Sequence, residues 1–115
     1  MRNKILIVDD SFINRELLTE MLEDEYEVIT CENGLQALEL MEENYNELAI
    51  ILLDLVMPVL DGVGFLKALQ NKPIMKDIPI LVISGETNVE TEIKCFDYGV
   101  FDFIKKPFDN RLRTL

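Results

Sequence analysis

Short apolar segments of this sequence end in residues that can bind a metal ion or a phosphate group. Asp9 and Asp10 follow one such segment, Asp54 ends another, Ser84 follows a third, and Lys106 follows a half-polar segment, residues 101–105. Short apolar runs of this kind are typical of strands buried on both faces of a parallel sheet. Ligands of such sheets bind just outside the carboxyl ends of the strands. We therefore expect these five side chains to meet at one edge of a sheet.

The three aspartates would carry like charges close to one another. Two carboxylates about 5 Å apart repel each other by roughly 3 kcal/mol at an effective dielectric constant near 20. Shared protons or a bound divalent cation would relieve this repulsion. A site made of carboxylates, a backbone carbonyl and water suits Mg²⁺ rather than zinc. Val56, two residues after Asp54, is placed to offer that carbonyl.

The remaining two side chains suggest what the site does. A carboxylate, a divalent cation, a hydroxyl and a fixed ammonium together can transfer a phosphoryl group. Asp54 would be the nucleophile, while Ser84, Lys106 and the cation neutralise the oxygens of the transferring group.

Each residue also has a simpler interpretation. Asp9 and Asp10 suit the N-terminus of a helix, Ser84 suits a helix cap, and most lysines are solvated. Lys105 is a rival of Lys106, and strand alternation leaves open which of the two faces the site. The placement of all these groups at the ends of four different strands favours the functional interpretation.

Five expected strands alternate with amphipathic helical segments, which predicts a parallel sheet with helices on both faces. The flavodoxin-like, doubly wound α/β order 2-1-3-4-5 fits because the two half-polar strands then lie at the edges. The expected strands cover residues 5–8, 27–31, 49–54, 80–83 and 101–105. The expected helices cover residues 12–22, 34–41, 62–71, 88–98 and, as a short fifth one, 110–115.

Helical spacing also predicts which side chains face the core. The expected inward residues are Phe12, Leu17, Leu18, Met21 and Leu22 in the first helix, Leu35, Ala37, Leu38 and Met41 in the second, and Phe65, Leu66 and Leu69 in the third.

Composition excludes several classes of function. The chain has 115 residues, enough for one domain, and its net charge of −11 disfavours direct binding to nucleic acid or a membrane surface. It has no histidine and two separated cysteines, Cys31 and Cys95, which we expect to be reduced core residues of a cytosolic protein. The N-terminal apolar run is too short for a signal peptide or a membrane span. Because the fifth helix is short, we expect the natural protein to continue past Leu115.

Taken together, these positions closely resemble the receiver domain of two-component response regulators, of the single-domain chemotaxis type. The resemblance covers residues 1–115 almost completely. The matching motifs are Asp9-Asp10, Asn33-Gly34 with Ala37-Leu38, Asp54, Met57-Pro58, Asp61-Gly62, Ser84, Gly99 with Asp102, and Lys106-Pro107-Phe108.

The resemblance implies a role for each site residue. Asp54 is the phosphoacceptor, and Asp9, Asp10, Asp54 and the Val56 carbonyl hold Mg²⁺, for which Mn²⁺ or Ca²⁺ can substitute. Ser84 and Lys106 contact the phosphoryl oxygens, and the resemblance selects Lys106 over Lys105 because the family lysine directly precedes the proline.

The resemblance further implies a switch and a cis peptide bond. The switch pair is Ser84 and Phe103, and Lys106-Pro107 is expected to be cis. Phe103 lacks the hydroxyl of the more common tyrosine. Val100 stands where the family usually has alanine.

The implied function is phosphorylation-activated signalling in the cytoplasm. A histidine kinase or phosphotransfer protein donates the phosphoryl group, and the face formed by the fourth helix, fifth strand and fifth helix then changes for partner binding or homodimerisation. The chain would not be a turnover enzyme, because it would only phosphorylate itself and slowly lose that group. Nucleic acid and membranes are not expected as direct partners.

Three other functions remain as alternatives. An aspartyl-nucleophile phosphatase would normally have a second aspartate at the position of Val56. A flavin module would not place Asp9 and Asp10 against the flavin phosphate. The third alternative is a receiver-like interaction module that acts without phosphorylation.

Overall fold

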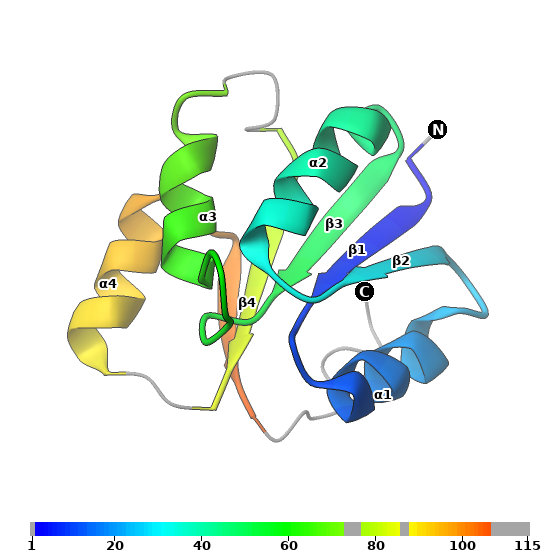
Figure 1. Ribbon diagram of the computed structural model, residues 1–115, viewed down its shortest axis with the longest axis horizontal. Helices are drawn as coiled ribbons and strands as arrows, with labels where there is room; N and C mark the ends of the chain where they lie inside the picture. The colour runs from blue at the N-terminus through cyan, green and yellow to red at the C-terminus, as the bar shows by residue number, and fades with distance from the viewer. Residues whose placement is uncertain (1, 73–76, 86–87, 107–115) are drawn as a thin grey trace.

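Five parallel strands form the centre of the computed structural model, which describes residues 2–72, 77–85 and 88–106 (Figure 1). The strand order is β2-β1-β3-β4-β5, which confirms the predicted flavodoxin-like topology. The strands are β1 (Lys4–Val8), β2 (Glu27–Cys31), β3 (Leu48–Leu53), β4 (Ile80–Ser84) and β5 (Asp102–Lys105). The helices in the described residues are α1 (Phe12–Leu22), α2 (Gly34–Asn44), α3 (Gly62–Leu69) and α4 (Val89–Asp97).

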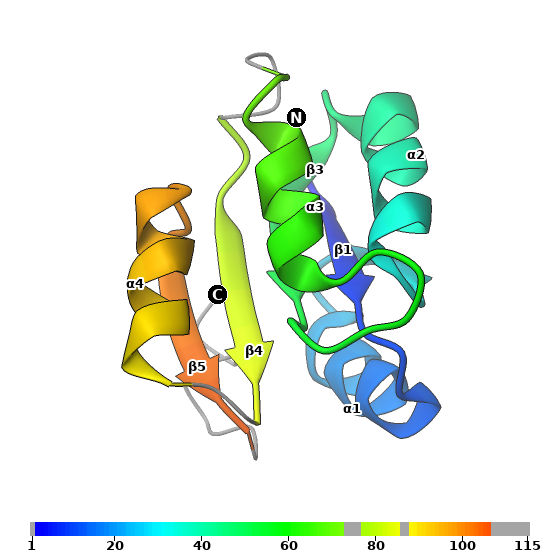
Figure 2. The same cartoon turned by 60° about the vertical axis from the view of Figure 1, so that its left-hand side comes forward.

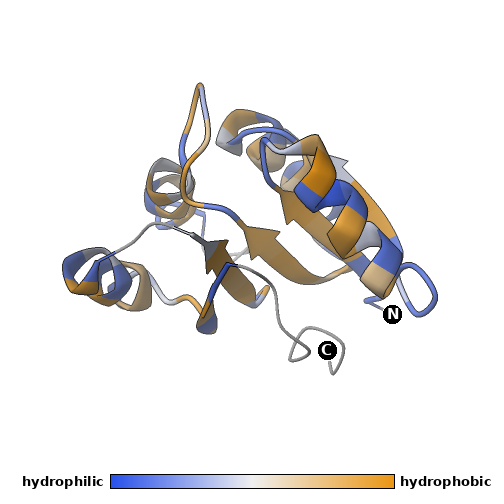
Figure 3. Cartoon of the chain, turned by 90° about the horizontal axis from the view of Figure 1, so that it is seen from below, coloured by the Kyte–Doolittle hydropathy of each residue, from blue (hydrophilic) through white to orange (hydrophobic). Residues whose placement is uncertain are grey.

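Helices cover both faces of the sheet, as the alternation predicted (Figures 1 and 2). Successive residues of a strand point to opposite faces. Leu6 and Val8 of β1 belong to the core cluster that includes buried residues of α2, α3 and α4, whereas Ile5 and Ile7 belong to the cluster that includes Leu18 and Leu22 of α1. Figure 3 shows the hydrophobic strands between helices that also carry hydrophilic residues. The central strands therefore have a core on each side, which is why their sequences are continuously apolar.

The observed boundaries differ slightly from the predicted ones. β3 ends at Leu53, so Asp54 lies just beyond the strand, and β5 begins at Asp102 rather than at residue 101. α3 ends at Leu69, two residues before its predicted end. The predicted fifth helix, residues 110–115, and Pro107 lie outside the described residues.

Part of the predicted core was wrong. Phe12, Leu17 and Leu35 are exposed, although their spacing placed them on the inward faces of α1 and α2. Only Leu18 and Leu22 of α1 are buried, and in α2 the buried large side chain is that of Met41. Leu18 and Leu22 are one turn apart on the same side of α1, whereas Leu17 lies about 100° away from Leu18 around the helix axis, so it falls outside the stripe that is buried against the sheet. Phe65, Leu66 and Leu69 of α3 are buried, as predicted.

The loop between β3 and α3 is tightly fitted. A Cβ atom on Gly62 would lie 2.6 Å from the carbonyl oxygen of Asp54, so only glycine fits there. Asp61 caps α3 by accepting a hydrogen bond of 2.7 Å from the Gly64 amide. Val59 has φ of 68°, a left-handed conformation that costs a β-branched residue about 1–2 kcal/mol. The packing of this loop, which begins at Asp54, therefore offsets the backbone strain at Val59.

Both cysteines are free and buried, as predicted. Among the described residues, no helix is long and apolar enough to cross a membrane.

Candidate functional site

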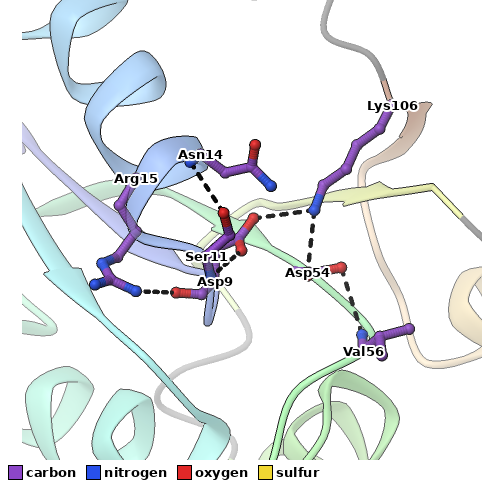
Figure 4. Close-up of polar contacts among 7 residues, drawn as sticks. All are labelled: Asp9, Ser11, Asn14, Arg15, Asp54, Val56 and Lys106. Carbon is purple, nitrogen blue, oxygen red and sulfur yellow. Dashed lines mark hydrogen bonds and ion pairs between the residues drawn. The ribbon is translucent and has the colours of Figure 1, made fainter.

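The carboxyl ends of β1, β3 and β4 and the residue after β5 bring the predicted site residues together. Figure 4 shows Asp9, Asp54, Val56 and Lys106 of this group. The registers of the parallel pairs align Val8 with Leu53 and Ser84 with Lys105, so the neighbouring strands end at the same level. Asp9 directly follows Val8, and Asp54 directly follows Leu53. This alignment follows from parallel pairing and needs no interaction between the polar side chains themselves.

Three carboxylates form the acidic part of the site. The candidate ligand oxygens of Asp9, Asp10 and Asp54 all lie within 4.8 Å of one another. Asp9 and Asp54 are only 2% and 6% exposed, whereas Asp10 is exposed. Opposite oxygens around Mg²⁺ are about 4.2 Å apart, only slightly closer than this spread. A set of hard oxygen donors with one side open to solvent therefore fits a divalent cation of this class.

Lys106 provides the positive charge next to these carboxylates. Its Nζ atom lies 3.2 Å from Oδ2 of Asp9 and 3.3 Å from Oδ2 of Asp54. Lys105, the last residue of β5, is exposed. Of the two lysines between which the residues alone left a choice, the structure places Lys106 in the acidic cluster.

The pKa of the Asp54 carboxyl is raised above its ordinary value of 3.8. Burial is the main cause, because it penalises the charged form, and the negative charge of Asp9 adds to the effect. The Lys106 ammonium and the Val56 amide, which donates to Oδ1 at 3.4 Å, act in the opposite direction. The ionised carboxylate is thus incompletely neutralised, which favours an incoming cation or electrophile.

Ser84 is fully buried at the end of β4, and within the described residues its Oγ atom has no hydrogen-bond partner. A buried hydroxyl without a partner costs about 1–3 kcal/mol. Ser84 lines an open pocket together with Asp54, Val56 and Lys106. Its hydroxyl is therefore available to donate to an oxygen atom that enters the pocket.

Phe103 is half-buried and packs on the core cluster that includes Val82 and Cys95. Phe103 is aligned with Val82 in the β4–β5 pair, and Ser84 lies two residues further along β4. Ser84 and Phe103 therefore lie on the same face of the sheet, which is the face that α4 covers.

Two further residues at this site were not predicted from the sequence. The Ser11 amide donates to Oδ1 of Asp9 at 2.9 Å, and Nη1 of Arg15 donates to the backbone carbonyl of Asp9 at 2.8 Å. Arg15 is the one basic residue of α1, the helix that follows the Asp9-Asp10 pair. This isolated positive charge is the sequence feature that could have identified it.

The chain matches known proteins over almost its whole length. A family model described as "Response regulator receiver domain" matches residues 5–114. The two-component response regulator-like protein PRR73 of Oryza sativa subsp. indica is 35% identical over 114 residues, which cover 97% of this chain and 15% of that protein. This chain therefore spans only a small part of that curated relative.

Solved structures agree with this match. The high-resolution structure of chemotaxis protein CheY4 of Vibrio cholerae has a TM-score of 0.86 and 32% identity, covering 97% of this chain and 92% of that one. The Mn²⁺-bound form of response regulator Rcp1 has a TM-score of 0.85 and 26% identity, covering 97% and 90% of the two chains.

Proposed function

The chain belongs to the response regulator receiver domain family, and from this premise we propose that it accepts a phosphoryl group on Asp54 from a phosphohistidine. The donor would be a histidine kinase or a phosphotransfer protein. The observation that carries the proposal is the position of the Lys106 ammonium, which bridges the buried carboxylates of Asp9 and Asp54. Such a bridge supplies a fixed positive charge where a phosphoryl group would arrive.

The proposed transfer makes one bond and breaks one. An Oδ atom of Asp54 attacks phosphorus, the N–P bond of the phosphohistidine breaks, and the imidazole nitrogen leaves with the electron pair. The Lys106 ammonium and the Ser84 hydroxyl, which no described residue engages in a hydrogen bond, donate to the phosphoryl oxygens. Because the product stays attached to Asp54, the chain acts as a receiver rather than as a turnover enzyme.

Asp9, Asp10, Asp54 and the Val56 carbonyl would hold the divalent cation, which we propose to be Mg²⁺, with Mn²⁺ or Ca²⁺ able to substitute. The cation supplies charge neutralisation to the phosphoryl oxygens and the carboxylates. The spread of the three carboxylates and the Mn²⁺-bound form of Rcp1 support this assignment.

Incubation with acetyl phosphate and Mg²⁺ should add one phosphoryl group to the chain, as measured by intact mass. Chelation of the divalent cation should prevent this gain, because the clustered carboxylates would then repel the phosphoryl oxygens. No gain with Mg²⁺ in a protein shown to be folded would contradict the proposal and favour a phosphorylation-independent interaction module.

We also propose that Ser84 and Phe103 transmit phosphorylation to the face that includes α4 and β5. The phosphoryl group adds about −1.5 to −2 charges at the strand ends. Movement of Ser84 toward it would leave space for the half-buried Phe103 to turn inward. Val89, Ile93 and Phe96 of α4 are exposed, which suits a surface for a protein partner or a second copy.

Phe103→Ala should abolish the response of α4 to phosphorylation, because no side chain is left to fill the vacated space. Hydrogen exchange of α4 and β5 amides, with and without acetyl phosphate and Mg²⁺, measures this response. Phe101→Ala is the matched control, since Phe101 is exposed and outside β5. An unchanged exchange response in Phe103→Ala would contradict the switch.

A further inference from the structure

Arg15 contacts the backbone of the acidic cluster formed by Asp9, Asp10 and Asp54, rather than its carboxylates. Its side chain is 12% exposed and extends from the second turn of α1. Nη1 donates to the backbone carbonyl of Asp9 at 2.8 Å, and Nη2 lies 3.4 Å from Oε1 of Glu32. The guanidinium also lies 5.8 Å from the ring centre of Phe12. In Figure 4, Arg15 contacts Asp9 from one side and Lys106 contacts it from the other.

These contacts complete a full set of restraints on Asp9. Its amide donates to the carbonyl of Cys31 at 3.1 Å, and its carboxylate accepts from the Ser11 amide and from Lys106. Arg15 holds the one remaining polar group, the carbonyl.

That carbonyl matters because it belongs to the peptide group that leads into Asp10. A peptide group is planar, so fixing the oxygen fixes the direction in which the next residue continues. The Asp10 side chain is exposed, and within the described part of the chain no group donates a hydrogen bond to its carboxylate. The orientation of Asp10 therefore depends on the backbone before it.

We infer that Arg15 is a positioning residue for the cation site: it fixes the Asp9–Asp10 peptide group so that both carboxylates face Asp54 before the cation binds. This inference rests on the proposed function, because the cation is the one that the receiver chemistry requires. Groups behind metal ligands typically change affinity by 10-fold to 100-fold when they are removed.

Two simpler roles for Arg15 predict different results. As a surface ion pair with Glu32, which is 62% exposed, it would contribute little and would not affect the site. As a bare positive charge near three carboxylates, it would weaken cation binding, so its removal would tighten binding. Positioning predicts the opposite sign.

Calorimetric titration of the unphosphorylated chain with Mg²⁺ separates these roles. Arg15→Met should weaken Mg²⁺ binding about 10-fold, and Arg15→Lys should weaken it less because one ammonium can still reach the carbonyl. The electron paramagnetic resonance signal of bound Mn²⁺ should show the same order of affinities. Neither readout depends on phosphorylation.

Arg2→Met is the matched control. Arg2, like Arg15, donates two hydrogen bonds, in its case to the backbone carbonyls of Tyr45 and Leu48 at 3.1 and 3.0 Å. It precedes β1 and so lies at the opposite end of that strand from Asp9. Its replacement removes the same charge and a similar pair of hydrogen bonds, and should leave Mg²⁺ affinity within about twofold of the wild type.

Unchanged or tighter Mg²⁺ binding by folded Arg15→Met would overturn the inference, as would an equal weakening in Arg2→Met. If Arg15→Met does not fold, Arg15→Gln, whose shorter side chain also lacks the guanidinium, decides by the same criterion. If the wild-type chain itself binds no Mg²⁺, the proposed function fails together with the inference. If the wild type binds Mg²⁺ and Arg15→Met binds it equally well, the inference fails but the proposed function does not.

Discussion

Asp54→Asn should abolish the gain of a phosphoryl group and at the same time stabilise the metal-free fold. An amide oxygen is a poor nucleophile, so no acceptor remains in the pocket. The pKa of Asp54 is raised by burial and by Asp9, so the ionised side chain opposes folding. Replacing such a functional group commonly stabilises a protein by on the order of 1 kcal/mol. Intact mass and urea unfolding without divalent ions measure the two effects.

The sign of the pH dependence follows from the same shift. At pH values between 3.8 and the raised pKa of the folded state, Asp54 binds more protons in the folded state than in the unfolded state. The free energy of unfolding of the wild type therefore falls as the pH rises through this window, and Asp54→Asn should remove that contribution. The rate of phosphorylation should rise over the same window because the attacking group is the carboxylate.

Asp61→Asn serves as the control for Asp54→Asn. It makes the same chemical change in the same loop, and asparagine caps a helix about as well as aspartate. It should change neither the phosphoryl gain nor the pH profile. Phosphorylation that persists in Asp54→Asn would mean that another residue is the acceptor.

Lys106→Met should slow phosphorylation by about 10²- to 10³-fold, the usual cost of removing one fixed donor to a developing charge. It should also lower the free energy of unfolding of the metal-free protein by about 2 kcal/mol, because two buried carboxylates would lose their common cation. Saturating Mg²⁺ should restore part of this stability by mass action. Rates of mass gain with acetyl phosphate, and urea unfolding with and without Mg²⁺, test these expectations.

Lys105→Met provides the comparison for Lys106→Met. The two lysines are adjacent and carry the same charge, but Lys105 is exposed. The Lys105→Met variant should therefore have a phosphorylation rate and a free energy of unfolding close to those of the wild type. Equal losses in both variants would show that the effect is general electrostatics rather than the contact of Lys106 with Asp9 and Asp54.

The sequence determined the sheet and the edge at which the site lies. Continuous apolar runs such as 49–53 have to be buried on both faces, and parallel strands joined by helices all end at one edge of the sheet. Asp9, Asp54 and Ser84 follow such runs directly, and Lys106 follows the half-polar last strand, so their approximate convergence follows from chain order alone.

Only the tertiary structure decided what depends on neighbours distant in the sequence. The contact of Lys106 with Asp9 spans almost the whole described chain, and the Arg15 contact depends on how α1 packs beside β1. The exposure of Phe12 was likewise set by the width of the stripe that α1 buries. Local periodicity fixes the direction in which a side chain leaves its element, but not where a long side chain ends or what covers it.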